Sequence, residues 1–171
     1  MPQGPQDPER ETLRSYLTAQ REHVLGILEG LGPEALRQPV LPSGWTCLGL
    51  VRHLAVDVER FWFRGVIAGE PTVIEQLARD SEDTWQVGST MSAEVVLDSY
   101  RQEIDRADAI VAATPIDAEP AWWPEELFGT WRLGALRDVL LHVLAETACH
   151  AGHLDAAREL LDGRQWMVLT D

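Results

Sequence analysis

The residues best suited to chemistry gather in one stretch, Leu136 to Gly163, which carries three of the five histidines. No proline interrupts it, apolar residues recur at helical spacing, and Asp162-Gly163 supplies a stop, so it predicts a long helix. At about 100° per residue, one carboxylate and three imidazoles fall within an arc of about 80° on this helix. These residues are His142, Glu146, His150 and His153. Such a stripe on an otherwise apolar helix indicates a metal site.

The metal hypothesis assigns three ligands. Zinc and its neighbours take nitrogen or carboxylate ligands, and a helix offers two of them most simply at positions i and i+4. Glu146 and His150 have that spacing, and the remaining imidazole within an apolar helix is His53. Two histidines and one glutamate leave one coordination position open, as in catalytic zinc sites. The alternative is that these side chains form ordinary structural hydrogen bonds.

Four helices must position these residues. Caps, stops and apolar periodicity predict helices near residues 8–30, 46–68, 92–114 and 136–163. The fold class is therefore all-α, an up-down four-helix bundle with long connecting loops, with one crossover across residues 70–90 as a variant. Residues 70–90 show no clear period and are expected to form a loop or short irregular elements. The aromatic-rich linker 115–133 is expected either to line a pocket mouth or to seal one end of the bundle.

Composition narrows the class of protein. A length of 171 residues suits one domain, expected over 9–171 after a disordered tail at 1–8. No apolar run is long enough to span a membrane, and the N-terminus lacks a secretory signal, which predicts a cytoplasmic protein. Cys47 and Cys149 are too few and too scattered for a disulfide framework. The net charge of −14 argues against nucleic acid as a partner.

Three blocks of sequence resemble a known family: GWTCLGLVRHLA at 44–55, ERFWFR at 59–64 and LRDVLLHVLAETACHAGHLD at 136–155. They are similar to the DinB-like superfamily, and more narrowly to its actinobacterial branch of mycothiol-dependent enzymes such as maleylpyruvate isomerase. The resemblance implies a four-helix bundle with a divalent metal, usually zinc or nickel. Carried over residue by residue, the metal ligands would be His53, Glu146 and His150. Many DinB-like proteins have histidine where this chain has Glu146, and the His-Glu-His set matches the isomerase type.

The resemblance also implies a reaction. Related enzymes use a low-molecular-weight thiol such as mycothiol, whose thiolate attacks a small-molecule electrophile. We therefore expect a metal-dependent thiol S-transferase or isomerase, in which Asp57, His142 and His153 tune the site or move protons. The alternatives are a metal-dependent hydrolase using water, and a non-enzymatic, stress-related bundle with a structural metal. A homodimer is also expected.

Basic side chains on the second helix raise one further question about the substrate. Arg52, Arg60 and Arg64 lie near the predicted site in sequence. They are expected either to receive a substrate carboxylate or to stay in solvent.

Overall fold

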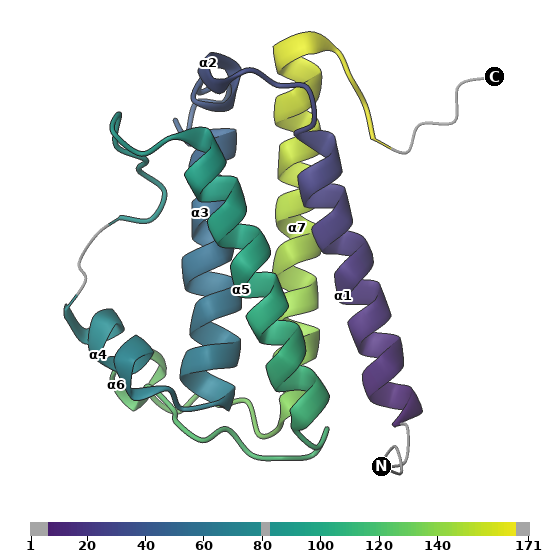
Figure 1. Cartoon of the computed structure of the whole chain (residues 1–171), viewed down its shortest axis with the longest axis vertical. Coiled ribbons are helices and arrows are strands. Elements are labelled where there is room, and N and C mark those ends of the chain that lie inside the picture. The colour runs from purple at the N-terminus through teal and green to yellow at the C-terminus, as the bar shows by residue number, and fades with distance from the viewer. Residues whose placement is uncertain (1–6, 80–82, 167–171) are drawn as a thin grey trace.

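Every regular element in the described part of the chain is a helix, which confirms the all-α class. The computed structural model describes residues 7–79 and 83–166 (Figure 1). The long helical segments are α1 (Pro8–Ile27), α3 (Cys47–His53) continued by η1 (Leu54–Ile67), α5 (Ala93–Ala113) and α7 (Leu136–Asp162). The shorter helices are α2 (Pro33–Leu36), α4 (Pro71–Arg79) and α6 (Glu125–Phe128).

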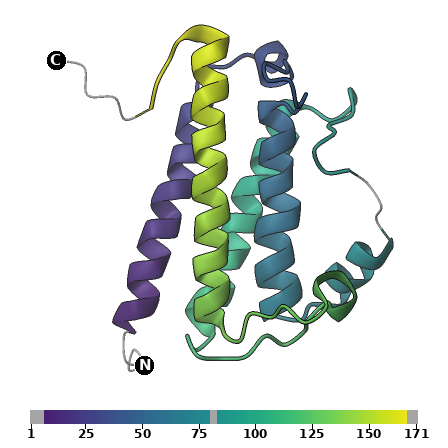
Figure 2. The ribbon, with the colours of Figure 1, turned by 180° about the vertical axis from the view of Figure 1, so that it is seen from behind.

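The long segments lie side by side, and their directions differ from a strict up-down order (Figures 1 and 2). Segments α3–η1 and α5 run the same way, and α1 and α7 both run the opposite way. Contacts fix the α1–α7 pairing at both ends: Arg137 binds Glu9 near the two starts, and Arg158 donates to the Ile27 carbonyl near the two ends. Because α3–η1 and α5 run the same way, the chain returns along the molecule between Ile67 and Ala93, and α4 belongs to this part of the chain. A strict up-down order would not need this return.

Local sequence signals set most of the helix starts. The Asp7 side chain accepts hydrogen bonds from the backbone N–H groups of Glu9 and Arg10, and Thr46 and Ser92 cap α3 and α5 in the same way. Such caps satisfy N–H groups that have no partner within the helix. At the other end of α7, Gly163 has a φ of +77°, a left-handed conformation that favours glycine. The four predicted helices therefore begin close to their expected residues.

The second long segment changes its winding after His53. From Leu54 to Ile67 the structure is a π-helix, in which each hydrogen bond spans five residues, as from Ala68 N to the Phe63 carbonyl at 2.9 Å. Residues four and five apart then share one face more closely than in an α-helix. As a result, several residues of this segment line one cleft: His53, Asp57, Val58, Phe61 and Trp62.

Two segments differ from their predictions. The stretch expected to be irregular contains α4, whose Val73 is buried. The predicted tail 1–8 overlaps the first helix, since Asp7 caps α1 and Pro8 begins it, while residues 1–6 lie outside the described part. After α7, Trp166 packs back where Gly26 leaves space for its ring, and residues 167–171 also lie outside. Among the described helices, none combines the length and apolar character that a membrane span requires.

Candidate metal centre

Three side chains from two segments converge as a group that could hold a metal ion. His53, at the end of α3, meets Glu146 and His150 on α7, with one potential ligand atom from each lying within 4.8 Å of the others. Glu146 Oε2 and His150 Nε2 are 3.3 Å apart, which follows from their i, i+4 spacing. The structure therefore brings together the three residues that the sequence predicted.

The donor set and its spacing fit a divalent ion. Zinc lies about 2.0–2.1 Å from nitrogen and carboxylate ligands, so two ligands of a tetrahedral site are about 3.4 Å apart. The Glu146–His150 separation matches that edge, and small side-chain movements would close the remaining distances. Burial of His150 and the nearby His53 ring lower the His150 pKa, which favours the neutral imidazole that a metal requires.

Asp57 holds the His53 ring in place. Its Oδ2 lies 2.8 Å from His53 Nδ1, and Thr84 donates a hydrogen bond to the same carboxylate oxygen. With Nδ1 engaged, His53 presents Nε2 as the ligand atom. The Trp85 indole stacks on His53 with ring centroids 4.4 Å apart, and it meets the His150 ring at 5.6 Å. A loop between α4 and α5 therefore covers one side of the group.

Along α7, His142 precedes and His153 follows the two candidate ligands of that helix, Glu146 and His150. His153 Nδ1 is 3.4 Å from His150 Nδ1, and its ring is exposed near Trp45. His142 contacts the rings of Trp62 and Trp131 at 4.6 and 5.6 Å, and burial lowers its pKa. Within the described residues, the group that could hold an ion does not include His142.

A cleft of about 310 Å³ opens beside the group. Its polar lining comes from His53, Asp57, His142 and Glu146, and its apolar wall comes from η1, α4 and α6. The apolar residues are Val58, Phe61, Trp62, Leu77, Leu127 and Phe128. Leu127 and Phe128 of the aromatic-rich linker therefore line a pocket, in agreement with the prediction that this linker lines a pocket mouth.

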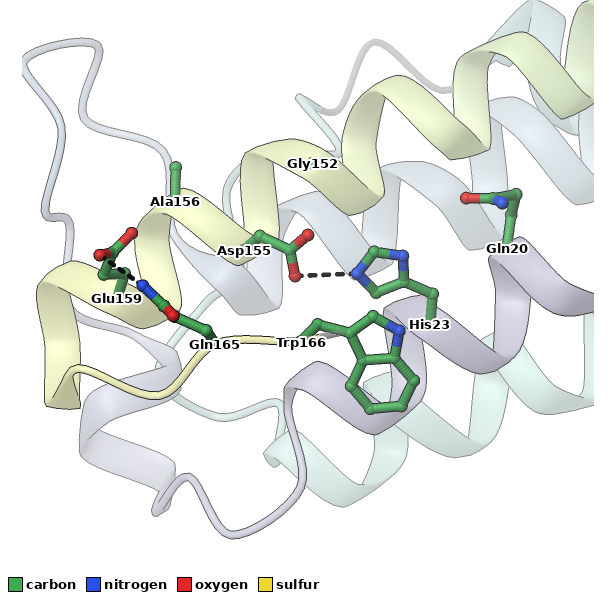
Figure 3. A pocket seen from close by; sticks show the side chains of 8 residues that line it. All are labelled: Gln20, His23, Gly152, Asp155, Ala156, Glu159, Gln165 and Trp166. Carbon is green, nitrogen blue, oxygen red and sulfur yellow. Dashed lines mark hydrogen bonds and ion pairs between the residues drawn. The ribbon is translucent and has the colours of Figure 1, made fainter. Parts of the chain in front are cut away.

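A larger cavity, of about 610 Å³, lies elsewhere, between α1, α7 and the segment after α7 (Figure 3). There His23 Nε2 is 2.8 Å from Asp155 Oδ1, and Trp166 stacks on the His23 ring at 5.1 Å. Gln165 donates a hydrogen bond to Glu159 across the same region. None of the three candidate ligands lines this cavity. We therefore assign the chemistry to the smaller cleft, because donor atoms that suit a metal lie there.

The arginines of the second segment are engaged in other contacts. Arg60 and Arg64 bind Glu103 of α5, and Arg64 also binds Glu70. Arg52 donates to the carbonyl groups of Asp83 and Gln86. Neither prediction for these side chains fits the structure well, since they serve contacts between segments and do not line the cleft.

Three neighbours of the site were not predicted from the sequence: Trp62, Thr84 and Trp85. Thr84 and Trp85 lie in a segment without periodicity, where only the single tryptophan signalled a packing role. Trp62 carried a stronger signal, because it belongs to the ERFWFR block of the resemblance. Its place in the cleft depends on contacts with Phe128 of α6 and His142 of α7, which are far from it in sequence.

These features define a class: an all-helical protein with a His-Glu-His group, suited to a divalent ion, beside an aromatic-walled cleft. A family model described as Mycothiol-S-transferase matches residues 12–163, which include all three candidate ligands. The chain therefore belongs to the mycothiol S-transferase family, and the predicted relation to mycothiol-dependent enzymes is confirmed. Searches of curated proteins and of solved structures gave no significant match.

Proposed function

We propose that this protein is a metal-dependent S-transferase that joins a low-molecular-weight thiol, mycothiol or a close analogue, to a small electrophile. The observation that carries the proposal is the His53–Glu146–His150 group inside a chain that matches the mycothiol S-transferase family. When bound there, zinc or nickel would supply the positive charge that favours a thiolate at neutral pH. The thiolate sulfur would then form a bond to the electrophile, and the leaving group would depart with its electron pair.

The remaining polar residues receive distinct roles in this proposal. Asp57 fixes the His53 tautomer through the 2.8 Å contact to Nδ1 and is a positioning residue. His142 lines the same cleft and would accept the proton that the thiol loses. His153, which is exposed beside His150, would meet the bound thiol at the outer edge of the site.

We also propose the finer features expected of this class. The long helices would form the four-helix bundle of DinB-like proteins in one domain over 9–171. The unpaired Cys47 and Cys149 support a reducing, cytoplasmic location. The homodimer stays a prediction.

The test combines metal content with thiol transfer. Purified wild-type protein should carry about one equivalent of zinc or nickel by mass spectrometry, while His53→Ala and Glu146→Ala should lose it. Wild type should conjugate mycothiol to an electrophile such as 1-chloro-2,4-dinitrobenzene, and both variants should lose this activity yet keep their helical circular dichroism. His23→Ala is the matched control, because His23 pairs with Asp155 away from the group.

Two outcomes favour the alternatives. Turnover of ester or amide substrates without any thiol would indicate a hydrolase that uses water. Full metal content without either activity, together with unfolding of His53→Ala, would indicate a structural metal in a non-enzymatic protein.

A further inference from the structure

Apolar surface extends beyond the cleft beside the candidate ligands. A second hollow, of about 610 Å³, shares two lining residues with it, Leu77 of α4 and Leu127 of α6. Its other apolar walls include Ile74, Trp122 and Trp123. The two hollows adjoin at these leucines of α4 and α6, and we call them together the apolar path.

Aromatic rings of η1 and α6 line the cleft, and Trp131 packs against them. Trp62 and Phe128 stack with centroids 5.6 Å apart and an angle of 13° between their planes, and Trp131 meets the edges of both. His142 adds its own ring against Trp62. Flat π surfaces of this kind pack best against planar apolar groups.

Apart from the candidate metal position and the two histidines of the cleft, the charged side chains that line this path are all acidic. Asp57 and Glu146 line the cleft, and Glu125 and Glu126 line the outer hollow. All 14 basic side chains are arginines that lie in the described residues, and none of them lines either hollow. The arginine next to the aromatic wall, Arg132, lies over the Trp123 ring and faces Glu125. A carboxylate that entered through the outer hollow would lose water there without gaining an arginine partner from its lining.

From these observations we infer that the path is the electrophile subsite and that it selects uncharged, planar aromatic electrophiles over carboxylates. The inference rests on the proposed S-transferase function and names its substrate class. With an aryl chloride, the thiolate sulfur forms the C–S bond, the C–Cl bond breaks and chloride leaves with the electron pair.

Binding of unreactive probes tests the subsite without any chemistry. The pair is 1,3-dinitrobenzene, which is neutral, and 3,5-dinitrobenzoate, which adds one carboxylate to the same ring. Quenching of tryptophan fluorescence should give the neutral probe a dissociation constant about tenfold or more below that of the carboxylate. Equal binding, tighter binding of the carboxylate, or no binding of either probe would overturn the inference.

A charge placed at the shared wall should change this preference. Leu127 is 69 % exposed, so Leu127→Arg adds a cation where the two hollows adjoin without disturbing the core. This variant should narrow the ratio of the two dissociation constants about fivefold or more. Leu160→Arg is the matched control, because Leu160 is 60 % exposed on α7 and lines neither hollow, and it should leave the ratio unchanged. An unchanged ratio in Leu127→Arg would count against the subsite.

Transfer assays separate this inference from the proposed function. With mycothiol present, 1-chloro-2,4-dinitrobenzene should react with a higher kcat/KM than 4-chloro-3,5-dinitrobenzoate, and Leu127→Arg should reduce the difference. Selective binding of the neutral probe with no transfer to either chloride would refute the S-transferase proposal and leave the subsite intact. Transfer that favours the benzoate would refute the subsite and leave the S-transferase proposal intact.

Discussion

Asp57 and Asp155 make the same contact with a histidine in different surroundings. Each carboxylate lies 2.8 Å from an imidazole nitrogen, of His53 and of His23 respectively. Only the first pair belongs to the candidate metal group, where the carboxylate would fix the tautomer and the orientation of a ligand. Comparing variants of the two pairs therefore shows whether a carboxylate affects metal binding because of where it lies or because it contacts a histidine.

Replacing Asp57 should therefore weaken metal binding. We expect Asp57→Asn to lower zinc affinity about 10–100-fold, because the neutral amide supports the His53 ring less well. Competition with a chromophoric chelator measures the affinity. Asp155→Asn removes the same kind of carboxylate from His23 and should leave the affinity unchanged; an equal loss in both variants would contradict the role given to Asp57.

The two cysteines should differ in reactivity. Burial raises the pKa of Cys47 to about 11, so its thiol stays protonated at pH 8, whereas Cys149 is exposed. The thiolate is the reactive form, and we expect iodoacetamide to modify Cys149 in the native protein and Cys47 only after unfolding. Peptide mass spectrometry identifies the site, with Cys149→Ser as the control. Rapid native modification of Cys47 would contradict the burial of its thiol.

At the residue scale, the candidate ligands could be predicted from the sequence for two reasons: two of them are close together in sequence, and few other histidines compete for the third position. Glu146 and His150 are one turn apart on a single helix, and His53 was the imidazole left within another apolar helix. Thr84 could not be predicted, since its contact with Asp57 spans 27 residues and depends on how the loop folds back.

At the scale of the elements, α3 and the loop between α4 and α5 approach each other closely, and this approach decides where Trp85 lies. A Cβ placed on Gly49 would lie 2.2 Å from the Trp85 carbonyl oxygen, closer than atoms can approach. Glycine at this position lets the loop backbone reach the helix, so that the indole covers His53 and His150.

Adding a methyl group at Gly49 should displace that loop. We expect Gly49→Ala to lower both the melting temperature and the zinc affinity, because the Trp85 backbone must move away from α3. Gly152→Ala is the matched control, since Gly152 also lies inside a helix and has nothing within 4 Å of an added Cβ. That change should stabilise the protein by about 0.5–1 kcal/mol through helix propensity. Calorimetry and chelator competition measure the two quantities, and an undisturbed Gly49→Ala would contradict the close approach.

The elements themselves were predictable where they were long and capped. Asp7, Thr46 and Ser92 each supplied a start signal that the structure uses. Helix α4 carried a weaker signal, namely Pro71 at its start and the apolar pair Val73 and Leu77 one turn apart, and nine residues gave too little periodicity to recognise it. The π-helical winding after His53 has no sequence signature comparable to a cap, because it is set by packing of the segment against its neighbours.

Across the whole molecule, one buried ion pair links three of the long segments. Arg21 of α1 donates to both Glu59 oxygens at 2.7 and 2.6 Å, and to Asp108 of α5 at 2.8 Å. Arg21 and Glu59 are 2 % and 0 % exposed. Burial raises the pKa of Glu59, and Arg21 opposes that effect. The Arg21 guanidinium therefore favours the ionised form of the Glu59 carboxylate, which burial alone would disfavour.

Removing the cation should destabilise the protein strongly. We expect Arg21→Met to lower the free energy of unfolding by about 3–5 kcal/mol at pH 7.5, because Glu59 stays buried without its partner. The folded-state pKa of Glu59 then lies further above its unfolded value, so the deficit should shrink as the pH falls and the carboxyl takes up a proton. Urea unfolding at pH 7.5 and pH 5.5 measures both effects.

The control for this variant is an ion pair of the same geometry at the surface. Arg137 donates to both Glu9 oxygens at 2.7 and 2.8 Å, with both side chains partly exposed. Arg137→Met should change the free energy of unfolding by about 1 kcal/mol or less. Equal losses in the two variants would show that burial does not govern the Arg21 pair.

The order in which the chain leaves the ribosome gives the parallel pairing of α1 and α7 a further consequence. The first helix finds its main neighbour only when the last one has been synthesised, and His53 likewise waits for Glu146 and His150, which lie on that last helix. A nascent chain that ends before α7 holds one candidate ligand of the three. Assembly of the three candidate ligands and closure of the core therefore belong to the same step, after α7 has left the exit tunnel.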